Sequence, residues 1–182
     1  MSDDTTPLDA DAMKRTAAGD VDAFGDIVHR HQTMLVNFFH RLGASMADAE
    51  DLAQETFYRV WQWRDRYQPT ARFTTFLLTL GRHAWVDGLR KQMRSPQQEG
   101  DGDLPMQLPD REVGTDRVET RLDVQQAIAV LTDKLREVVV LSVYHGLEYK
   151  DIGAILEIPE GTVKSRMFHA MRRLRELLEP PR

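Results

Sequence analysis

A dense run of acidic and amide side chains occupies residues 48–55, which read DAEDLAQE. Offsets of three, four and seven would align two carboxylates, an amide and a phenol on one helical face: Asp51, Gln54, Glu55 and Tyr58. Paired carboxylates could perform acid–base catalysis, hold a divalent metal or contact another protein. Both chemical roles need a group that converges from another element, which this local pattern does not supply. We therefore expect a polar protein-docking face.

A second cluster mixes cations with a ring in the helical stretch 72–92. Its members lie on or near one helical face: Arg82, His83, Val86, Arg90 and Lys91. Cations beside flat rings suit single-stranded nucleic acid, because charge meets phosphate and rings meet bases. An ordinary basic C-terminal turn, which favours the helix dipole, would have the same composition. This helix alone does not decide between the two.

The third cluster lies in two helices joined by a tight turn. Residues 149–156 predict a short helix, and Pro159 stands where the first residue of a longer helix belongs. This arrangement is the helix-turn-helix pattern. The inward side of the longer helix is apolar: Val163, Met167, Ala170, Met171 and Leu174. The outward side can enter a major groove or simply be solvated, and it presents Thr162, Lys164, Ser165, Phe168, His169, Arg172 and Arg173.

Several classes of site lack their defining residues. The chain has no Cys, which removes disulfides, thiol nucleophiles and Cys-rich zinc sites. His29 and His31 are two positions apart and cannot share a helical face, so we expect no metal and no cofactor. The phosphate-loop, dinucleotide and serine-hydrolase motifs are missing as well. We expect a protein that is not an enzyme.

Helical spacing of apolar residues runs through most of the chain, and no alternating strand pattern is found. The expected helices cover 24–42, 47–66, 72–92, 124–131, 134–145, 149–156 and 159–178. The stretch 95–120 contains three Pro and three Gly without periodicity, which is typical of a linker. We predict an all-α fold class with two small helical domains, 14–94 and 121–182. A flexible acidic linker, 95–120, joins them, and an acidic tail, 1–13, precedes them.

The net charge of −5 conceals an uneven distribution. Residues 1–13 hold four acids and no bases, and residues 95–123 hold eight acids against three Arg. The remaining segments are mildly basic, which is compatible with nucleic acid as a partner. No apolar run approaches the roughly 18 residues of a membrane span, and the N-terminus lacks a secretory pattern. We expect a cytoplasmic protein without membrane insertion.

In their order and separation, the three clusters resemble a bacterial RNA polymerase sigma factor of the extracytoplasmic-function group. Residues 20–92 resemble its region-2 domain, with the motif D-A-E-D-L-x-Q-E-x-F at 48–57. Residues 122–178 resemble region 4, with G-L-x-Y-x-[DE]-I and P-x-G-T-V-[KR]-S-R at 146–152 and 159–166. The two domains together cover most of the chain, and their combination across an acidic linker is highly specific.

The resemblance implies a role for each cluster. Docking on the clamp coiled coil of core polymerase would use Asp48, Asp51, Gln54, Glu55, Tyr58 and Trp61. The −10 promoter element would be faced by Arg82, His83, Asp87, Arg90 and Lys91. The −35 element would be read by Thr162, Lys164, Ser165, Arg166, Phe168, His169 and Arg172. The resemblance also implies a monomer controlled by an anti-sigma factor, with the linker on the path toward the polymerase active site.

Three positions depart from the family pattern. Phe76 stands where Trp is frequent, and His83 stands where Asn is common, so the −10 preference cannot be copied from relatives. Glu157 occupies the turn position that often holds Gly, at a cost of roughly 1 kcal/mol if its φ is positive.

Two other classes of protein stay open at this point. A stand-alone regulator would dimerise and read paired half-sites through its helix-turn-helix. A metal-dependent hydrolase would instead use the acids of the first cluster as its site: Asp48, Glu50, Asp51 and Glu55.

Overall fold

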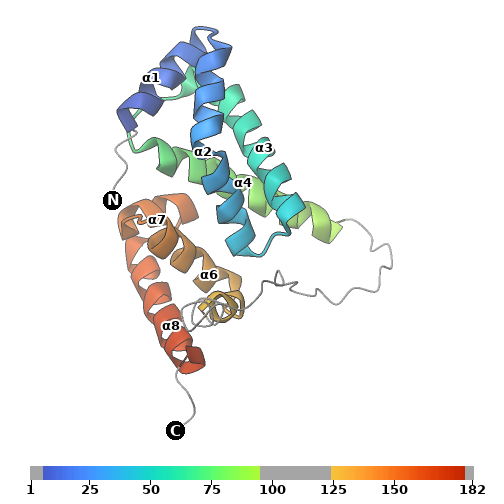
Figure 1. Cartoon of the computed structure of the whole chain (residues 1–182). Coiled ribbons are helices and arrows are strands. Elements are labelled where there is room, and N and C mark those ends of the chain that lie inside the picture. Colours follow the sequence, from blue (N-terminus) through green and yellow to red (C-terminus); the bar gives the residue numbers. More distant parts are fainter. Residues whose placement is uncertain (1–5, 95–123, 179–182) are drawn as a thin grey trace, which may run out of the picture.

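The computed structural model describes residues 6–94 and 124–178, and every regular element within these ranges is helical (Figure 1). The first block comprises α1 (Thr6–Ala17), α2 (Val21–Leu42), α3 (Met46–Trp63), the 3₁₀ turn η1 (Arg64–Arg66) and α4 (Phe73–Arg94). The second comprises a helical turn at 124–129, α6 (Asp133–Val139), the π-helical turn η2 (Val140–Tyr144), α7 (Tyr149–Leu156) and α8 (Glu160–Leu178). The all-α fold with two helical domains is confirmed, while the expected linker, 95–120, lies outside the described residues.

Local capping signals set the ends of α2 and α3. The Asp20 side chain accepts a hydrogen bond from the Ala23 N–H at 3.0 Å, and Ser45 Oγ accepts one from the Asp48 N–H at 3.1 Å. Gly43 ends α2 in the left-handed region, with φ 114°, where its N–H bonds to the His40 carbonyl. The orientation of α3 relative to α2 is therefore fixed by this short connection.

The first block buries the apolar faces of α2, α3 and α4 against one another. Its fully buried side chains include Leu35, Phe38, Phe39, Val60, Phe73, Leu77 and Leu78. Burying each such side chain contributes about 2 kcal/mol, so this core holds α3 and α4 in fixed orientations.

The N-terminal segment differs from the solvated tail that its acidic composition predicts. Its described part belongs to α1, whose span crosses the expected domain boundary at residue 13. Asp9 is only 1% exposed. Its carboxylate pairs with the Arg30 guanidinium, and its Oδ2 lies 3.0 Å from His31 Nε2. These two partners on α2 make burial of the acid possible, because a buried charge without a partner is costly.

The helix-turn-helix of the second block depends on a glycine inside α7. A Cβ on Gly153 would lie 2.9 Å from the Ile158 carbonyl oxygen, closer than van der Waals contact allows. That approach lets the Ile158 N–H bond to the Gly153 carbonyl at 3.0 Å and turns the chain into α8. Glu157 sits in this turn with φ 55°, so the cost considered for a positive φ at this position applies.

The second block packs against the first through α4 and the C-terminal end of α2. Figure 1 shows α4 crossing beneath α2 and α3, with α7 beside it on the opposite side. The described parts of the two domains are thus in direct contact.

Candidate protein-docking and nucleic-acid interfaces

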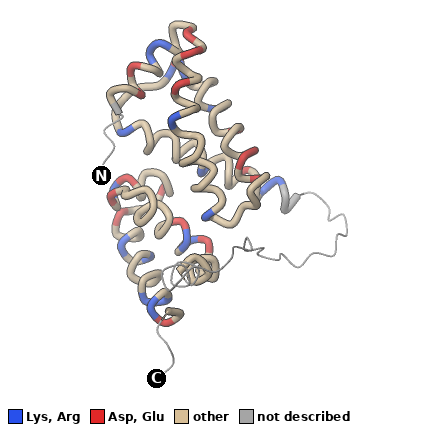
Figure 2. Tube along the Cα trace, viewed as in Figure 1, with Lys and Arg blue, Asp and Glu red and all other residues tan. Residues whose placement is uncertain are grey.

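The acidic face of α3 is open to solvent. Its exposed side chains are Asp48, Glu50, Asp51, Gln54, Glu55 and Tyr58. Figure 2 shows acidic positions gathered toward the N-terminal end of this helix. Trp61, expected on the same surface, is half-buried, because its ring packs edge-on against Phe24 at 5.1 Å and beneath the Arg64 guanidinium at 4.5 Å. Only part of this aromatic ring is available to a partner.

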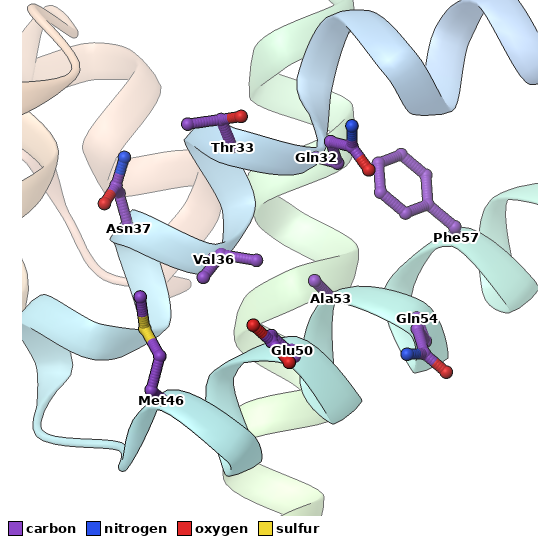
Figure 3. Close-up of a pocket in the computed structure, with 9 residues that line it drawn as sticks. All are labelled: Gln32, Thr33, Val36, Asn37, Met46, Glu50, Ala53, Gln54 and Phe57. Carbon is purple, nitrogen blue, oxygen red and sulfur yellow. The ribbon is translucent and has the colours of Figure 1, made fainter.

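A groove of about 410 Å³ runs beside this acidic face, between α2 and α3 (Figure 3). Its lining consists of Gln32, Thr33, Val36, Asn37, Met46, Glu50, Ala53, Gln54 and Phe57. Val36 and Ala53 lie in its middle, with Met46 toward one end and Phe57 toward the other. The α2 residues of this groove were not found from the sequence, because only the packing of two helices brings them beside α3.

Two of the expected docking residues also have local structural roles. The Asp48 carboxylate accepts a hydrogen bond from the N-cap hydroxyl of Ser45 at 2.6 Å. Glu55 Oε1 accepts one from Arg59 Nε at 2.8 Å, and Arg59 Nη1 donates to Asp87 Oδ2 on α4 at 3.0 Å. Arg59 therefore connects the acidic face of α3 to the helix expected to face the −10 element.

The predicted cluster on α4 is divided by the second block. Arg82 is 19% exposed, and its Nε lies 3.6 Å from Glu137 Oε1 of α6. His83 Nε2 lies 3.3 Å from Glu157 Oε1 of the helix-turn-helix. By contrast, Asp87, Arg90 and Lys91 are exposed.

The partner of Arg82 is itself an unusual carboxylate. Burial raises the pKa of Glu137, while the positive charges of Arg82 and Arg166 act in the opposite direction. Glu137 is 13% exposed, so its ionised form depends on these two cations.

The outward face of α8 is polar and accessible over most of its length. Lys164, Ser165, Phe168, His169 and Arg172 are exposed, while Thr162 and Arg166 are half-buried. Met171 is 50% exposed, so its predicted inward position is wrong. Hydrogen bonding to Glu160 raises the pKa of the Lys164 ammonium. This helix presents a charged rim around the exposed Phe168 ring.

Two features of the described ranges bear on other kinds of site. Within 6–94 and 124–178, no group of three or more His, Asp or Glu side chains is placed to hold a metal ion. No helix among these residues is long and apolar enough to cross a membrane.

Two family models match the chain in the order of its two helical blocks. The model for Sigma-70 region 2 matches residues 27–95, and a model for Sigma-70 region 4 matches residues 121–174. Among characterised proteins, the chain is 31% identical to the extracytoplasmic-function sigma factor SigW of Bacillus subtilis, over 91% of this chain and 94% of SigW. It is 34% identical to the sigma factor CarQ of Myxococcus xanthus, over 91% of this chain and 95% of CarQ.

Solved structures show the same two-block architecture. The sigma factor RpoE in complex with the anti-sigma factor NepR, from Bartonella quintana, superposes with a TM-score of 0.66 at 26% identity, covering 87% of this chain and 98% of RpoE. CnrH in complex with the cytosolic domain of CnrY superposes with a TM-score of 0.68 at 22% identity, covering 94% of this chain and 97% of CnrH, which bears on the fold alone.

Proposed function

This chain belongs to the extracytoplasmic-function group of the sigma-70 family, and on that premise we propose which of its surfaces carries each part of the activity. A sigma factor of this group binds core RNA polymerase and directs initiation at promoters with −10 and −35 elements. We assign the region-2 domain to 14–94 together with the preceding turns of α1, the linker to 95–120 and the region-4 domain to 121–182. The chain acts in the cytoplasm as a monomer and is not itself an enzyme.

The acidic face of α3 and the adjoining groove form the docking surface for the clamp coiled coil of core polymerase. The observation that carries this proposal is an exposed acidic helix beside a groove with apolar residues in its middle. An amphipathic helix of the partner can place an apolar side chain between Val36 and Ala53. Basic groups on that helix then meet Glu50 and Asp51 at the rim, which speeds association and fixes orientation.

The promoter contacts belong to α4 and α8. Arg82, His83, Asp87, Arg90 and Lys91 face the −10 element, where cations meet the phosphates of the opened strand. The N-terminal turns of α8 enter the major groove at −35, with Lys164 and Ser165 as hydrogen-bond donors. Each domain offers few phosphate contacts, so DNA binding by the free chain is weak and salt-sensitive. Core polymerase holds both domains at a fixed spacing and thereby raises the effective concentration of each.

An anti-sigma factor is the proposed regulator. The superposition on RpoE in its complex with NepR supports this assignment, since the likeness extends over most of both chains. A regulator that covers the groove between α2 and α3 would compete directly with polymerase.

The docking surface is tested by the double substitution Asp51→Ala with Gln54→Ala. We expect at least about a tenfold loss of affinity for purified core polymerase, because two exposed contacts at the centre of an interface are removed. Helix content stays unchanged, since both side chains are exposed. The matched control is Asp26→Ala with Gln125→Ala, which removes the same two residue types from other exposed positions.

A second measurement tests the activity as a whole. Core polymerase with the wild-type chain is expected to produce promoter-dependent transcripts from a promoter library, and the double variant is expected to produce none. Wild-type core affinity in the double variant would refute the docking surface. Absence of promoter-dependent transcripts with the wild-type chain would refute the function.

A further inference from the structure

The contact between the two domains uses side chains of the proposed −10 surface. On α4, Arg82 pairs with Glu137 and His83 pairs with Glu157, at 3.6 and 3.3 Å. Both basic side chains belong to region 2, and both carboxylates belong to region 4. The acids of one domain thus occupy the space that nucleic acid would need in order to contact the basic side chains of the other.

Burial separates this contact from a loose encounter of surface charges. Arg82 is 19% exposed and Glu137 is 13% exposed, so the pair is largely covered. A phosphate cannot reach a covered guanidinium unless the second domain moves away. The exposed pair of His83 and Glu157 extends the same contact toward the helix-turn-helix.

The contact continues to the C-terminal end of α2. Arg136 Nη1 donates to the Leu42 carbonyl at 2.8 Å, and Arg136 Nη2 donates to the Leu131 carbonyl at 2.9 Å. One guanidinium therefore satisfies carbonyls at two helix ends that belong to different domains. A Cβ on Gly43 would lie 3.1 Å from Arg136 Nη1, so the glycine that ends α2 also admits this side chain.

Aromatic contacts also join α2 to the second block. The Arg41 guanidinium lies 4.2 Å from the centre of the Tyr144 ring, in cation–π geometry. The rings of Phe38 and His145 meet edge-on, with centres 5.6 Å apart. The interface thus combines the charged pairs of α4 with a cation–π contact and an edge-on ring contact of α2.

The dimensions of this arrangement are incompatible with reading both promoter elements. Elements centred about 25 base pairs apart lie about 85 Å apart along B-DNA. A compact chain of 182 residues has a radius of gyration of only about 16 Å. The chain between residues 94 and 124 would reach about 100 Å if fully extended, so covalent connection permits the separation. The domains must therefore part before both elements are bound.

We infer that the free chain masks itself in part: region 4 docks on region 2, covers Arg82 and engages His83, and so keeps these two residues of α4 from promoter DNA until the domains separate. This inference rests on the proposed function, since the −10 role of α4 is part of it. His83 and Glu157 are both departures from the family pattern, and they contact each other. The exposed part of the masking contact therefore joins two residues that lie outside the family pattern.

The domain contact is tested by energy transfer between two dyes on the full chain. The chain has no Cys, so Asp22→Cys and Gln125→Cys, at exposed positions in the two domains, provide the only attachment sites. Glu137→Gln with Glu157→Gln is expected to lower the transfer efficiency, because both interdomain pairs are lost. The control, Glu160→Gln with Glu176→Gln, removes two acids that form ion pairs with basic residues of the same helix, α8, and it is expected to leave transfer unchanged.

Masking is tested by the affinity of the same proteins for a single-stranded −10 oligonucleotide. The Glu137 and Glu157 double variant is expected to bind at least about threefold more tightly than the control, since a larger fraction is competent to bind. Glu157→Gly alone is expected to shift both readouts in the same direction. It keeps the turn folded, because Gly adopts positive φ freely.

Each outcome is informative. Unchanged transfer in the double variant would overturn the domain contact. Lower transfer without a gain in oligonucleotide affinity would overturn masking. Lower transfer together with absent promoter-dependent transcripts from the wild-type chain and core polymerase would support the contact while overturning the proposed function and, with it, the masking role.

Discussion

The α3 and α4 helices pack side by side in region 2, yet they present their functional side chains in opposite ways. On α3, the acidic residues proposed to dock on polymerase are exposed, and a groove lies open beside them. On α4, the first two residues proposed to face the promoter contact region 4, and Arg82 is largely covered. In the free chain, the acidic face of α3 is therefore accessible to a partner, whereas Arg82 and His83 of α4 already contact region 4.

This difference suggests an order of events. Core polymerase can engage α3 while the domains are still docked, because the docking surface does not include the interdomain contact. On the proposed assignment, promoter DNA can engage Arg82 and His83 of α4 only after region 4 has moved. Polymerase binding before promoter binding is then a consequence of which surface is covered.

The largest expected effect comes from destabilising region 4, the domain that covers Arg82. Gly153→Ala places a Cβ 2.9 Å from the Ile158 carbonyl oxygen, inside the turn that supports α8. We expect region 4 to lose about 3 kcal/mol of unfolding free energy through overpacking, while α3 keeps its affinity for core polymerase. Denaturant unfolding and core binding measure the two effects.

Gly25→Ala provides the control for that substitution. Gly25 lies within α2, and a Cβ there would meet nothing within 4 Å. Alanine at this position is expected to add about 1 kcal/mol to stability, because glycine is the poorer helix former. Equal stabilities of the two variants would show that the close approach at Gly153 carries no weight.

A fall in pH is expected to have a smaller effect on the unfolding free energy. It acts through His145, whose ring contacts Phe38 of α2. Burial, assisted by the positive charge of Arg41, lowers the pKa of His145 to about 4, below its usual value of 6.5. The unfolded state therefore binds the proton first, and stability present at pH 7 is lost as the pH falls from about 6.5 toward 4. We expect unfolding free energy to be about 2 kcal/mol lower at pH 5 than at pH 7 from this group.

His145→Gln isolates the contribution of this histidine from those of other titrating groups. Glu137 acts in the opposite sense, because burial raises its pKa and acid therefore relieves the cost of its charge. The difference between wild type and variant removes that shared part. If the unfolding free energy of the variant depends on pH as steeply as that of the wild type, His145 is not the responsible group.

The smallest effect concerns Arg59, whose hydrogen bonds link α3 to α4. Arg59→Met removes the hydrogen bonds to Glu55 and Asp87, which are expected to contribute about 1 kcal/mol together. Arg59→Lys is expected to restore the loss only in part, since an ammonium lacks the planar fork that reaches two carboxylates. Thermal unfolding is expected to give the highest midpoint for the wild type, a lower one for Arg59→Lys and the lowest for Arg59→Met. Equal midpoints would show that the hydrogen bonds of Arg59 do not contribute to stability.

Local signals explain why most of the helical fold could be predicted from the sequence. The predicted helix 72–92 corresponds to α4 (Phe73–Arg94), and 47–66 corresponds to α3 followed by η1. The Gly43 stop was also readable, because a left-handed C-cap favours glycine. These features depend on neighbours within a few residues.

Features that depend on distant partners could not be predicted. The segment containing Asp9 looks solvated until Arg30 and His31 are placed beside it by the packing of α1 on α2. The covered state of Arg82 likewise depends on Glu137, which lies in the other domain. The sequence identified His83 and Glu157 as departures from the family pattern, but only the structure shows that they meet.

Carboxyl footprinting of the chain, free and bound to core polymerase with promoter DNA, probes the docking face of α3 through Asp51 and the covering of α4 through Glu137 of α6. In the free chain we expect rapid modification of Asp51, which is exposed, and slow modification of Glu137, which is 13% exposed. In the complex the order is expected to reverse, with Asp51 protected and Glu137 modified rapidly. Rapid modification of Glu137 in the free chain, or of Asp51 in the complex, would contradict the assignment of these surfaces.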